Sequence, residues 1–254
     1  MSSPTQSAEP GPRPAPPTPA DFQEQIAGLQ PVFELESLVG GALTEMGLGD
    51  VVGESVETHP KTRPDFCVLH FVILPQRSAW IDFVLETDRA SALAIYALFS
   101  GLSEAEDTDL EDMLRETMNL IHGALKVAFK KEDGSLIIPV VPQSVDADQV
   151  LRGRGGLSHE RRYLFRAPGL TLRLTMVARI APITRRQLRD LRLANVLVEA
   201  LCPDENQEVV LIKSGTMLNE RTLEKVLDIA EFDTEGKTLP VIDPSPLAAT
   251  IGLR

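Results

Sequence analysis

The chain has 254 residues, of which 43% are hydrophobic and 24% are charged, and its formal net charge is −12 at pH 7. These values are typical of a globular protein with one large domain or two small ones. The acidic balance disfavours a nucleic-acid-binding protein or a peripheral membrane protein. No apolar stretch approaches the roughly 20 residues that span a bilayer. The N-terminus has no basic segment followed by an apolar one, so we predict no secretory signal and a cytoplasmic location.

The first part of the chain is predicted to contain a tail, a helix and several strands. Residues 1–20 include seven prolines among small residues, which predicts a disordered tail. Apolar residues then recur at helical spacing from Pro31 to Met46. Three strand-like runs follow, at residues 51–58, 66–74 and 79–86, the last two forming a hairpin. Asp88 is a suitable cap for a second helix, which we expect to end near Gly101.

A third helix is predicted over residues 108–131, with Thr108 and Glu111 as its capping box. At about 100° per residue, four residues of this helix fall within an arc of roughly 60°. They are Asp112, Glu116, Asn119 and Gly123. The opposite side is apolar, so this narrow polar line is expected to face outward. Periodicity alone indicates ordinary solvated surface. Asn and Gly, however, are poor choices for an exposed helix, and a glycine lets another backbone approach closely, as a docking surface would require, so both interpretations stay open at this point.

The remaining elements are mainly strands and loops. A short apolar run at residues 135–141 predicts a strand, and residues 143–160 are expected to form a long mobile loop. Residues 162–167 and 170–180 flank Pro168-Gly169 and predict a hairpin, and residues 170–180 alternate between apolar and polar side chains. After Pro182 we predict a partly helical stretch at 188–201, a strand at 209–213 and a helix at 219–229 that is capped by Asn219.

The charge is unevenly distributed along the chain. Residues 152–192 contain eleven arginines and two acids, a net charge of +9, so the rest of the chain carries −21. Residues 104–116 contain seven acids and one arginine. Arginines on a strand face are usually solvated or paired with acids. We therefore expect the arginine-rich segment to be neutralised by ion pairs within the chain.

The polar line carries a known motif. Asp112-x-x-x-Glu116-x-x-Asn119, followed after 22 residues by Pro142, resembles the signature of the CheC/CheX/FliY chemotaxis phosphatases. The order of elements over residues 31–181 is similar to a CheX-type domain. The resemblance implies an α+β fold in which an antiparallel sheet packs against helices, one of which exposes the motif. The segment after Pro182 is extra to this domain, and its strand and helix pattern predicts a small C-terminal α/β module. We therefore divide the chain into a tail (1–20), a CheX-like domain (21–182) and an accessory module (183–254).

The resemblance also implies an activity, namely hydrolysis of the phospho-aspartate of a CheY-like response regulator. Asn119 would orient the attacking water, because an amide can accept from water and donate to phosphoryl oxygens without bringing a negative charge. Glu116 would pair with the active-site lysine of the regulator. Asp112, Gly123 and Pro142 are assigned to partner binding or to the geometry of the motif. The chain would need no metal or other cofactor of its own, and Mg²⁺ is expected on the partner.

Several alternatives remain. A second copy of the motif is absent, so the chain resembles the single-motif CheX branch, which implies a homodimer. A non-catalytic adaptor that uses the same helix face is the competing function. Arg185 and Arg189 form an RxxxR sequence without the second motif of cyclic-di-GMP-binding PilZ domains, and nucleic acid is not expected as a partner. Cys67 and Cys202 predict neither a disulfide framework nor a metal site, and His122 is expected to be a surface residue beside the motif.

Overall fold

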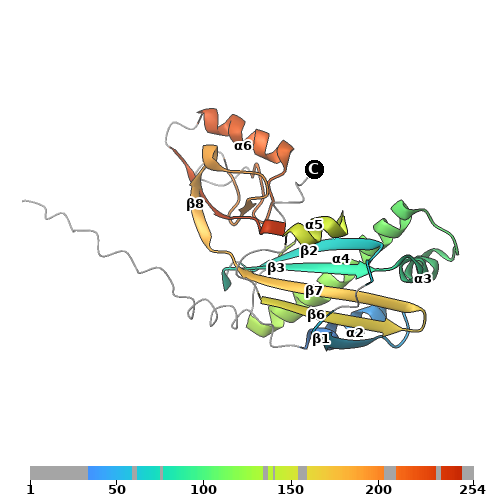
Figure 1. The fold of residues 1–254 in the computed structure, drawn as a ribbon. Coiled ribbons are helices and arrows are strands. Elements are labelled where there is room, and N and C mark those ends of the chain that lie inside the picture. Colours follow the sequence, from blue (N-terminus) through green and yellow to red (C-terminus); the bar gives the residue numbers. More distant parts are fainter. Residues whose placement is uncertain are drawn as a thin grey trace, which may run out of the picture.

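The computed structural model describes residues 34–58, 62–74, 77–133, 137–139, 141–153, 159–202, 210–232 and 236–247. The predicted tail and the first residues of the predicted N-terminal helix lie outside this part. The described chain has an α+β fold with a large sheet, a small sheet and helices around them (Figure 1). Within the described residues, no helix is both long and apolar enough to cross a membrane.

The large sheet has seven strands, and every pairing in it is antiparallel. Its order is β1-β6-β7-β3-β2-β4, and β5 also pairs with β2. The strands are β1 (Val52–Val56), β2 (Phe66–Leu74), β3 (Ala79–Thr87), β4 (Ile138–Pro139), β5 (Gln143–Val145), β6 (His159–Ala167) and β7 (Leu170–Ile180). Both predicted hairpins, β2–β3 and β6–β7, are confirmed.

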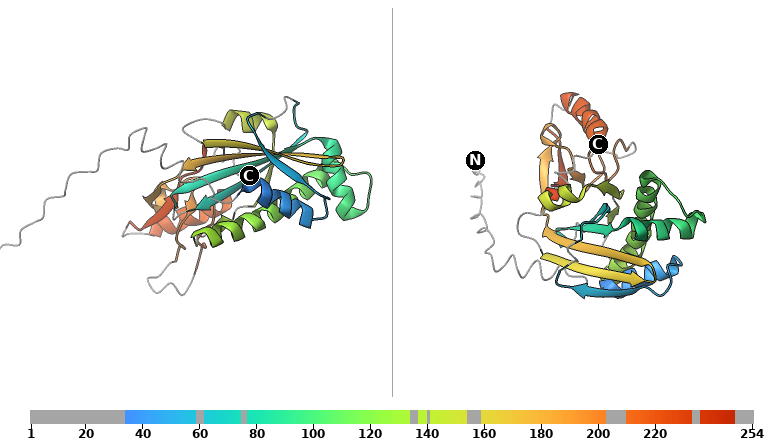
Figure 2. Two further views of the ribbon diagram at one scale, coloured as in Figure 1. Left: turned by 90° about the horizontal axis from the view of Figure 1, so that it is seen from below. Right: turned by 45° about the vertical axis from the view of Figure 1, so that its right-hand side comes forward.

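Three helices cover one face of this sheet. They are α2 (Leu35–Glu45), α3 (Arg89–Ser100) and α4 (Asp107–Asp133). Their apolar sides pack on alternate residues of β2, β3 and β7, such as Val68, Phe83 and Leu174, in one core. Helix α2 lies beside α4 under the sheet (Figure 2). It approaches β1 so closely that a Cβ at Gly53 would come within 2.8 Å of the Glu36 carbonyl oxygen, so only glycine fits there.

The other face of the sheet is covered by α5 (Ala147–Gly153) and by the C-terminal unit. Strand β8 leads out of the large sheet into this unit (Figure 1). The unit contains β8 (Ile183–Gln187), the 3-10 turn η2 (Leu188–Asp190), β9 (Val196–Leu197), α6 (Glu220–Phe232) and β10 (Thr238–Ile242). Its three strands form a sheet in the order β8-β10-β9. Phe71 and Trp80 of the large sheet share a core with Val196, Ile242 and Leu247 of the unit.

A buried carboxylate joins the two parts. Asp82 of β3 has no exposed surface. Its Oδ1 accepts hydrogen bonds from Trp80 Nε1 at 2.5 Å and from Ser245 Oγ at 3.0 Å. Arg179 Nε of β7 lies 3.6 Å from the other carboxylate oxygen. Because Ser245 follows the last strand of the C-terminal unit, Asp82 connects that unit directly to the large sheet.

Three predicted segments are wrong. The strand predicted at residues 209–213 is the first, because residues 210–213 contain only an isolated β-bridge between Ile212 and Leu201. Residues 143–160 were expected to be a mobile loop, but they include β5, α5 and the start of β6, and only 154–158 lie outside the described residues. These short elements are fixed by pairing of β5 with β2 and by burial of Val150. Residues 188–201 were expected to be partly helical, but only the turn η2 is helical. Hydrogen bonds from this stretch to residues 212–218 replace a helix.

Helix ends agree well with the sequence. Asp88 Oδ1 accepts from the Ser91 N–H at 2.7 Å, and Gly101 ends α3 with φ 73°. Asn219 Oδ1 accepts from the Thr222 N–H at 2.9 Å before α6. Helix α4 begins one residue earlier than predicted, at Asp107. These side chains satisfy backbone N–H groups that a helix start leaves free.

Part of the arginine-rich segment is paired within the described chain, since four of its eleven arginines form ion pairs there and Arg173 donates hydrogen bonds. Arg166 pairs with Glu54, Arg179 with Asp82, and Arg186 with Asp243. Arg173 donates to Thr62, and Arg162 pairs with Glu160. Most of these contacts join residues far apart in the sequence, so the segment ties the chain together.

Candidate functional site

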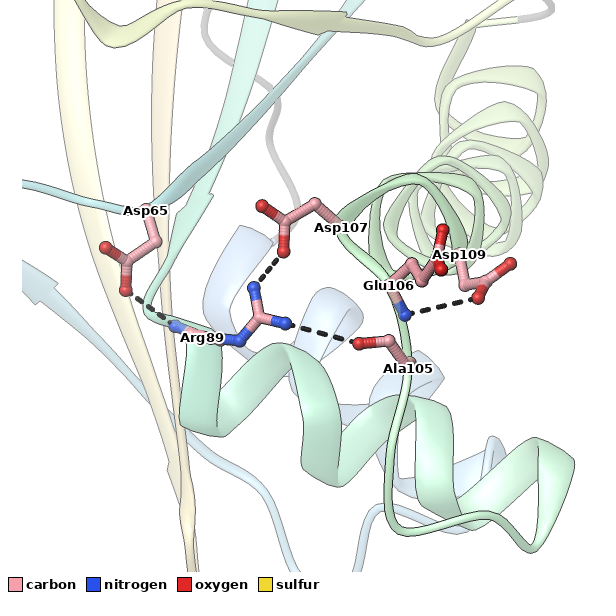
Figure 3. Close-up of polar contacts among 6 residues, drawn as sticks. All are labelled: Asp65, Arg89, Ala105, Glu106, Asp107 and Asp109. Atoms are coloured by element: carbon pink, nitrogen blue, oxygen red, sulfur yellow. Dashed lines mark hydrogen bonds and ion pairs between the residues drawn. The ribbon is translucent and has the colours of Figure 1, made fainter.

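A clamp at the junction of α3 and α4 fixes the start of the motif helix (Figure 3). The Arg89 guanidinium pairs with Asp107 and donates to the Ala105 carbonyl at 3.2 Å, while its backbone N–H donates to Asp65 Oδ2 at 2.8 Å. The Glu106 N–H donates to Asp109 Oδ2 at 3.3 Å. This hydrogen bond caps the N-terminus of α4, where the sequence predicts a capping box of Thr108 and Glu111. The clamp therefore places the first turn of α4 against the sheet.

The outward side of α4 borders a groove of about 480 Å³. The groove is lined by Tyr96, Asp109, Asp112, Met113, Arg115, Glu116, Asn119, Val141 and Pro142. All four positions of the sequence motif, Asp112, Glu116, Asn119 and Pro142, thus lie on one hollow. Pro142 reaches it because β5, which starts at the next residue, is hydrogen-bonded to β2.

Four polar side chains of the groove form two separate pairs along the helix. Asn119 Nδ2 donates to Glu116 Oε1 at 3.4 Å. Arg115 forms an ion pair with Asp112 one turn earlier. Glu116 and Asn119 are exposed, while the next residues, Thr117 and Met118, are buried in the core. Because the apolar side is held by the sheet, the amide and the carboxylate are presented on a rigid element.

Gly123 lies outside the groove but on the same exposed side of α4. A Cβ at this position would meet nothing within 4 Å. The neighbouring outward side chains are apolar, with Leu120 50% exposed and Val127 54% exposed. Val141, on the opposite border of the groove, is 74% exposed. The second half of the helix therefore presents exposed apolar side chains beside the exposed Lys126 and Lys130.

His122 is not the surface residue that the sequence suggested. Its Nδ1 lies 2.6 Å from Nε2 of His70, a fully buried residue of β2, and the rings meet edge to face. Burial, together with the neighbouring His122, lowers the pKa of His70 to about 3. Burial lowers the pKa of His122 as well, and the positive charge of Lys126 adds to this. The pair is therefore a neutral hydrogen-bonded contact that joins α4 to the sheet just behind the motif.

Five lining residues were not singled out by the sequence. They are Tyr96, Asp109, Met113, Arg115 and Val141. Arg115 could have been recognised, because it is three residues from Asp112 and four from Asn119, which are the spacings of neighbours on a helix surface. Tyr96 comes from α3, and only the fold brings it to the groove.

No metal centre is visible in the part of the chain that is described. No group of three or more His, Cys, Asp or Glu side chains is arranged there to hold an ion. The groove instead combines three carboxylates, one guanidinium and one amide. Such a set can position a water molecule and contact a cation or a phosphoryl group, but it contains no nucleophile paired with a base.

Comparison with known proteins gave matches among solved structures alone. No protein-family model matches the chain, and no curated protein matches it. The chain is similar to CheX from Vibrio vulnificus (14% identity, TM-score 0.46, 58% of this chain and 98% of that chain covered). It is also similar to a chain of the CheX–CheY–BeF3–Mg complex from Borrelia burgdorferi (15%, 0.45, 57% and 95%).

A third similar structure is the FliM middle domain from Vibrio alginolyticus, with 11% identity, a TM-score of 0.40, and coverage of 61% of this chain and 91% of that chain. All three likenesses cover a little over half of this chain. What the groove can do is therefore inferred from its own residues.

Proposed function

We propose that the chain is a phosphatase of phosphorylated CheY-like response regulators in two-component or chemotaxis signalling. The observation that carries the proposal is the groove, which gathers Asp112, Glu116, Asn119 and Pro142 at the spacing of the CheC/CheX/FliY signature. Asn119 and Glu116 are exposed on a helix whose other side is packed in the core, as a docking surface requires.

Asn119 acts on the water. A regulator's acyl phosphate is already reactive and is surrounded by the regulator's own Mg²⁺ and lysine, so the remaining task is to place a water molecule in line with the breaking P–O bond. The Asn119 amide oxygen accepts a hydrogen bond from this water, and its NH₂ group faces a phosphoryl oxygen. The water attacks phosphorus, the aspartate carboxylate leaves, and inorganic phosphate is released.

Glu116 fixes the position of the docked regulator. Its carboxylate pairs with the regulator's active-site lysine, which places Asn119 over the phosphoryl group. In the free chain the same carboxylate accepts from Asn119 Nδ2 at 3.4 Å, a long contact that the lysine can replace. All of these residues come from one chain, so the reaction does not depend on the homodimer that the resemblance implies.

A non-catalytic adaptor would use the same face without accelerating decay. The two readings differ in Asn119, because binding alone needs shape and charge but no amide over the phosphoryl group. A chain that binds the phosphorylated regulator without shortening its lifetime is an adaptor.

The test is the decay of a phosphorylated regulator from the same organism, measured with the wild-type chain and three variants. The wild type should accelerate decay, and Asn119→Ala and Glu116→Ala should each abolish most of the acceleration. Glu224→Ala, which removes an exposed acid from α6, is the matched control and should behave as the wild type. Lack of acceleration by the wild type with every such regulator would contradict the proposal.

A further inference from the structure

The groove carries negative charge, although the group that it is proposed to bind is also negative. Three of its side chains are carboxylates, namely Asp109, Asp112 and Glu116, and the phosphoryl group that should enter it is an anion. Glu116 is occupied by the partner's lysine in the proposed complex, but the other two remain. The carboxylates of Asp109 and Asp112 repel an anion in the groove, and exclusion of water by a docked partner strengthens this repulsion.

Arg115 is the one cation among the lining residues. Its guanidinium pairs with Asp112. It also stands four residues before Asn119, so the two side chains are neighbours along the helix surface. Side chains on a helix lean toward its N-terminus, so Arg115 leans toward Asp112 and Asn119 leans back toward Arg115. The guanidinium and the amide therefore border the same part of the groove.

We propose that Arg115 contacts the phosphoryl group of the docked regulator and that Asp112 holds its guanidinium in place. This inference rests on the proposed function and extends it to a residue outside the family signature. A guanidinium has five N–H donors in a planar fork, so it can remain bonded to Asp112 while it donates to a phosphoryl oxygen. Asp112 is then a positioning residue, which gives this motif position a task in this chain.

The test compares binding of two forms of one regulator. Affinity is measured for the unactivated regulator and for its beryllofluoride-activated form, in which a fluoride complex replaces the phosphoryl group. Arg115→Ala should weaken binding of the activated form by about 10-fold or more, as expected for loss of a charge-assisted hydrogen bond, and change binding of the unactivated form by less than about 2-fold. Arg115→Lys should recover part of the loss, because it restores the charge without the fork.

Two further variants separate contact from a general charge effect. Lys130→Ala removes a cation from the same helix, about 20 Å from Arg115 and outside the groove, and should change neither affinity. Asp112→Ala should give a smaller selective loss, and Asp112→Ala combined with Arg115→Ala should be no worse than Arg115→Ala alone. Full recovery in the double variant would overturn the proposal, because Arg115 would then serve only to neutralise Asp112.

The outcomes also separate this inference from the proposed function. Equal losses for both regulator forms, or no loss for either, in Arg115→Ala would overturn the role of Arg115 while leaving the phosphatase intact. A wild type that prefers the activated form but does not accelerate decay of the phosphorylated regulator would refute the phosphatase, and the binding comparison would still decide the role of Arg115. A wild type that binds neither form would overturn both.

Discussion

The two faces of the large sheet are covered in different ways. On one face, helices α2, α3 and α4 close an apolar core, and the outer side of α4 carries the groove. On the other face, the C-terminal unit closes a core that includes the buried carboxylate of Asp82, and Arg173 and Arg179 are also buried.

The two faces also differ in where their charged groups lie. The pKa of Asp82 is raised to about 6, mainly because burial disfavours its charged form. Its partners, Trp80, Ser245 and Arg179, are structural, and it lies in the seam between the sheet and the C-terminal unit rather than in the groove. The candidate active site is instead a set of exposed side chains on a rigid helix. In this chain the shifted pKa of Asp82 therefore marks the contact between the large sheet and the C-terminal unit.

The largest expected effect on stability comes from removing the Asp82 carboxylate. Asp82→Ala removes the carboxylate that accepts from the Trp80 N–H and from the Ser245 hydroxyl and that pairs with Arg179. We expect the free energy of unfolding to fall by about 3–5 kcal/mol. Urea unfolding measures this, with Asp228→Ala, an exposed acid on α6, as the control. An effect below about 1 kcal/mol would mean that Asp82 does not hold the two parts together.

Ionisation of Asp82 should lower the free energy of unfolding as pH rises. In ordinary acid denaturation, by contrast, the free energy of unfolding falls as pH falls. Its folded pKa of about 6 exceeds the usual 3.8. Between these values the folded state holds a proton that the unfolded state has lost, so this group lowers stability as pH rises from about 4 to 6. Asp82→Asn should remove this contribution, which amounts to about 2 kcal/mol between pH 4.5 and pH 7. Urea unfolding of the wild type and of Asp82→Asn at pH 4.5 and pH 7 measures this contribution. The difference in the free energy of unfolding between the two proteins should change by that amount from one pH to the other.

The helix-covered face should respond to pH in the opposite direction. The folded pKa of His70 is about 3, below its usual 6.5, so the unfolded state takes up a proton first as pH falls. Stability contributed by neutral His70 is complete above pH 6.5 and is lost as pH falls toward 3. His70→Gln should lessen the loss between pH 6.5 and 4.5 by about 2–3 kcal/mol. An unchanged loss in this variant would place the acid sensitivity elsewhere.

The smallest expected effect lies on the docking side of α4. Gly123→Ala should raise the free energy of unfolding by about 0.8–1 kcal/mol, because the new Cβ meets no neighbour and alanine favours the helix. The same change should weaken regulator binding if a partner backbone approaches there. Gly41→Ala, on the exposed side of α2 with equally open space, is the matched control and should stabilise the chain without affecting binding.

Much of the fold was predictable because its signals are local. The hairpins β2–β3 and β6–β7 follow from strand runs separated by turn residues, and α4 follows from its apolar spacing and acidic start. The motif was predictable in the same way, because Asp112, Glu116 and Asn119 are fixed on one side by helix geometry alone. Pro142 joins them only through the pairing of β5 with β2.

The misses have a common physical cause, which is contact between distant parts of the chain. Residues 143–160 have no periodic pattern of their own, and β2 supplies the partner that orders β5. Apolar spacing in residues 188–201 resembles a helix, but this stretch instead packs and hydrogen-bonds within the C-terminal unit. His122 is partly buried and contacts His70, which is 52 residues away in the sequence. None of these contacts can be predicted from a local sequence pattern.

The central claim, that function resides on the outer side of α4, is tested most directly by the lifetime of a phosphorylated regulator with the wild type, Asn119→Ala and Ser245→Ala. Asn119→Ala should reduce the acceleration to near the spontaneous rate while leaving urea stability within about 0.5 kcal/mol of the wild type. Ser245→Ala, which removes the hydroxyl that donates to Asp82, should lower stability but leave the acceleration unchanged under folding conditions. Retention of the acceleration in Asn119→Ala, or its selective loss in folded Ser245→Ala, would contradict the account.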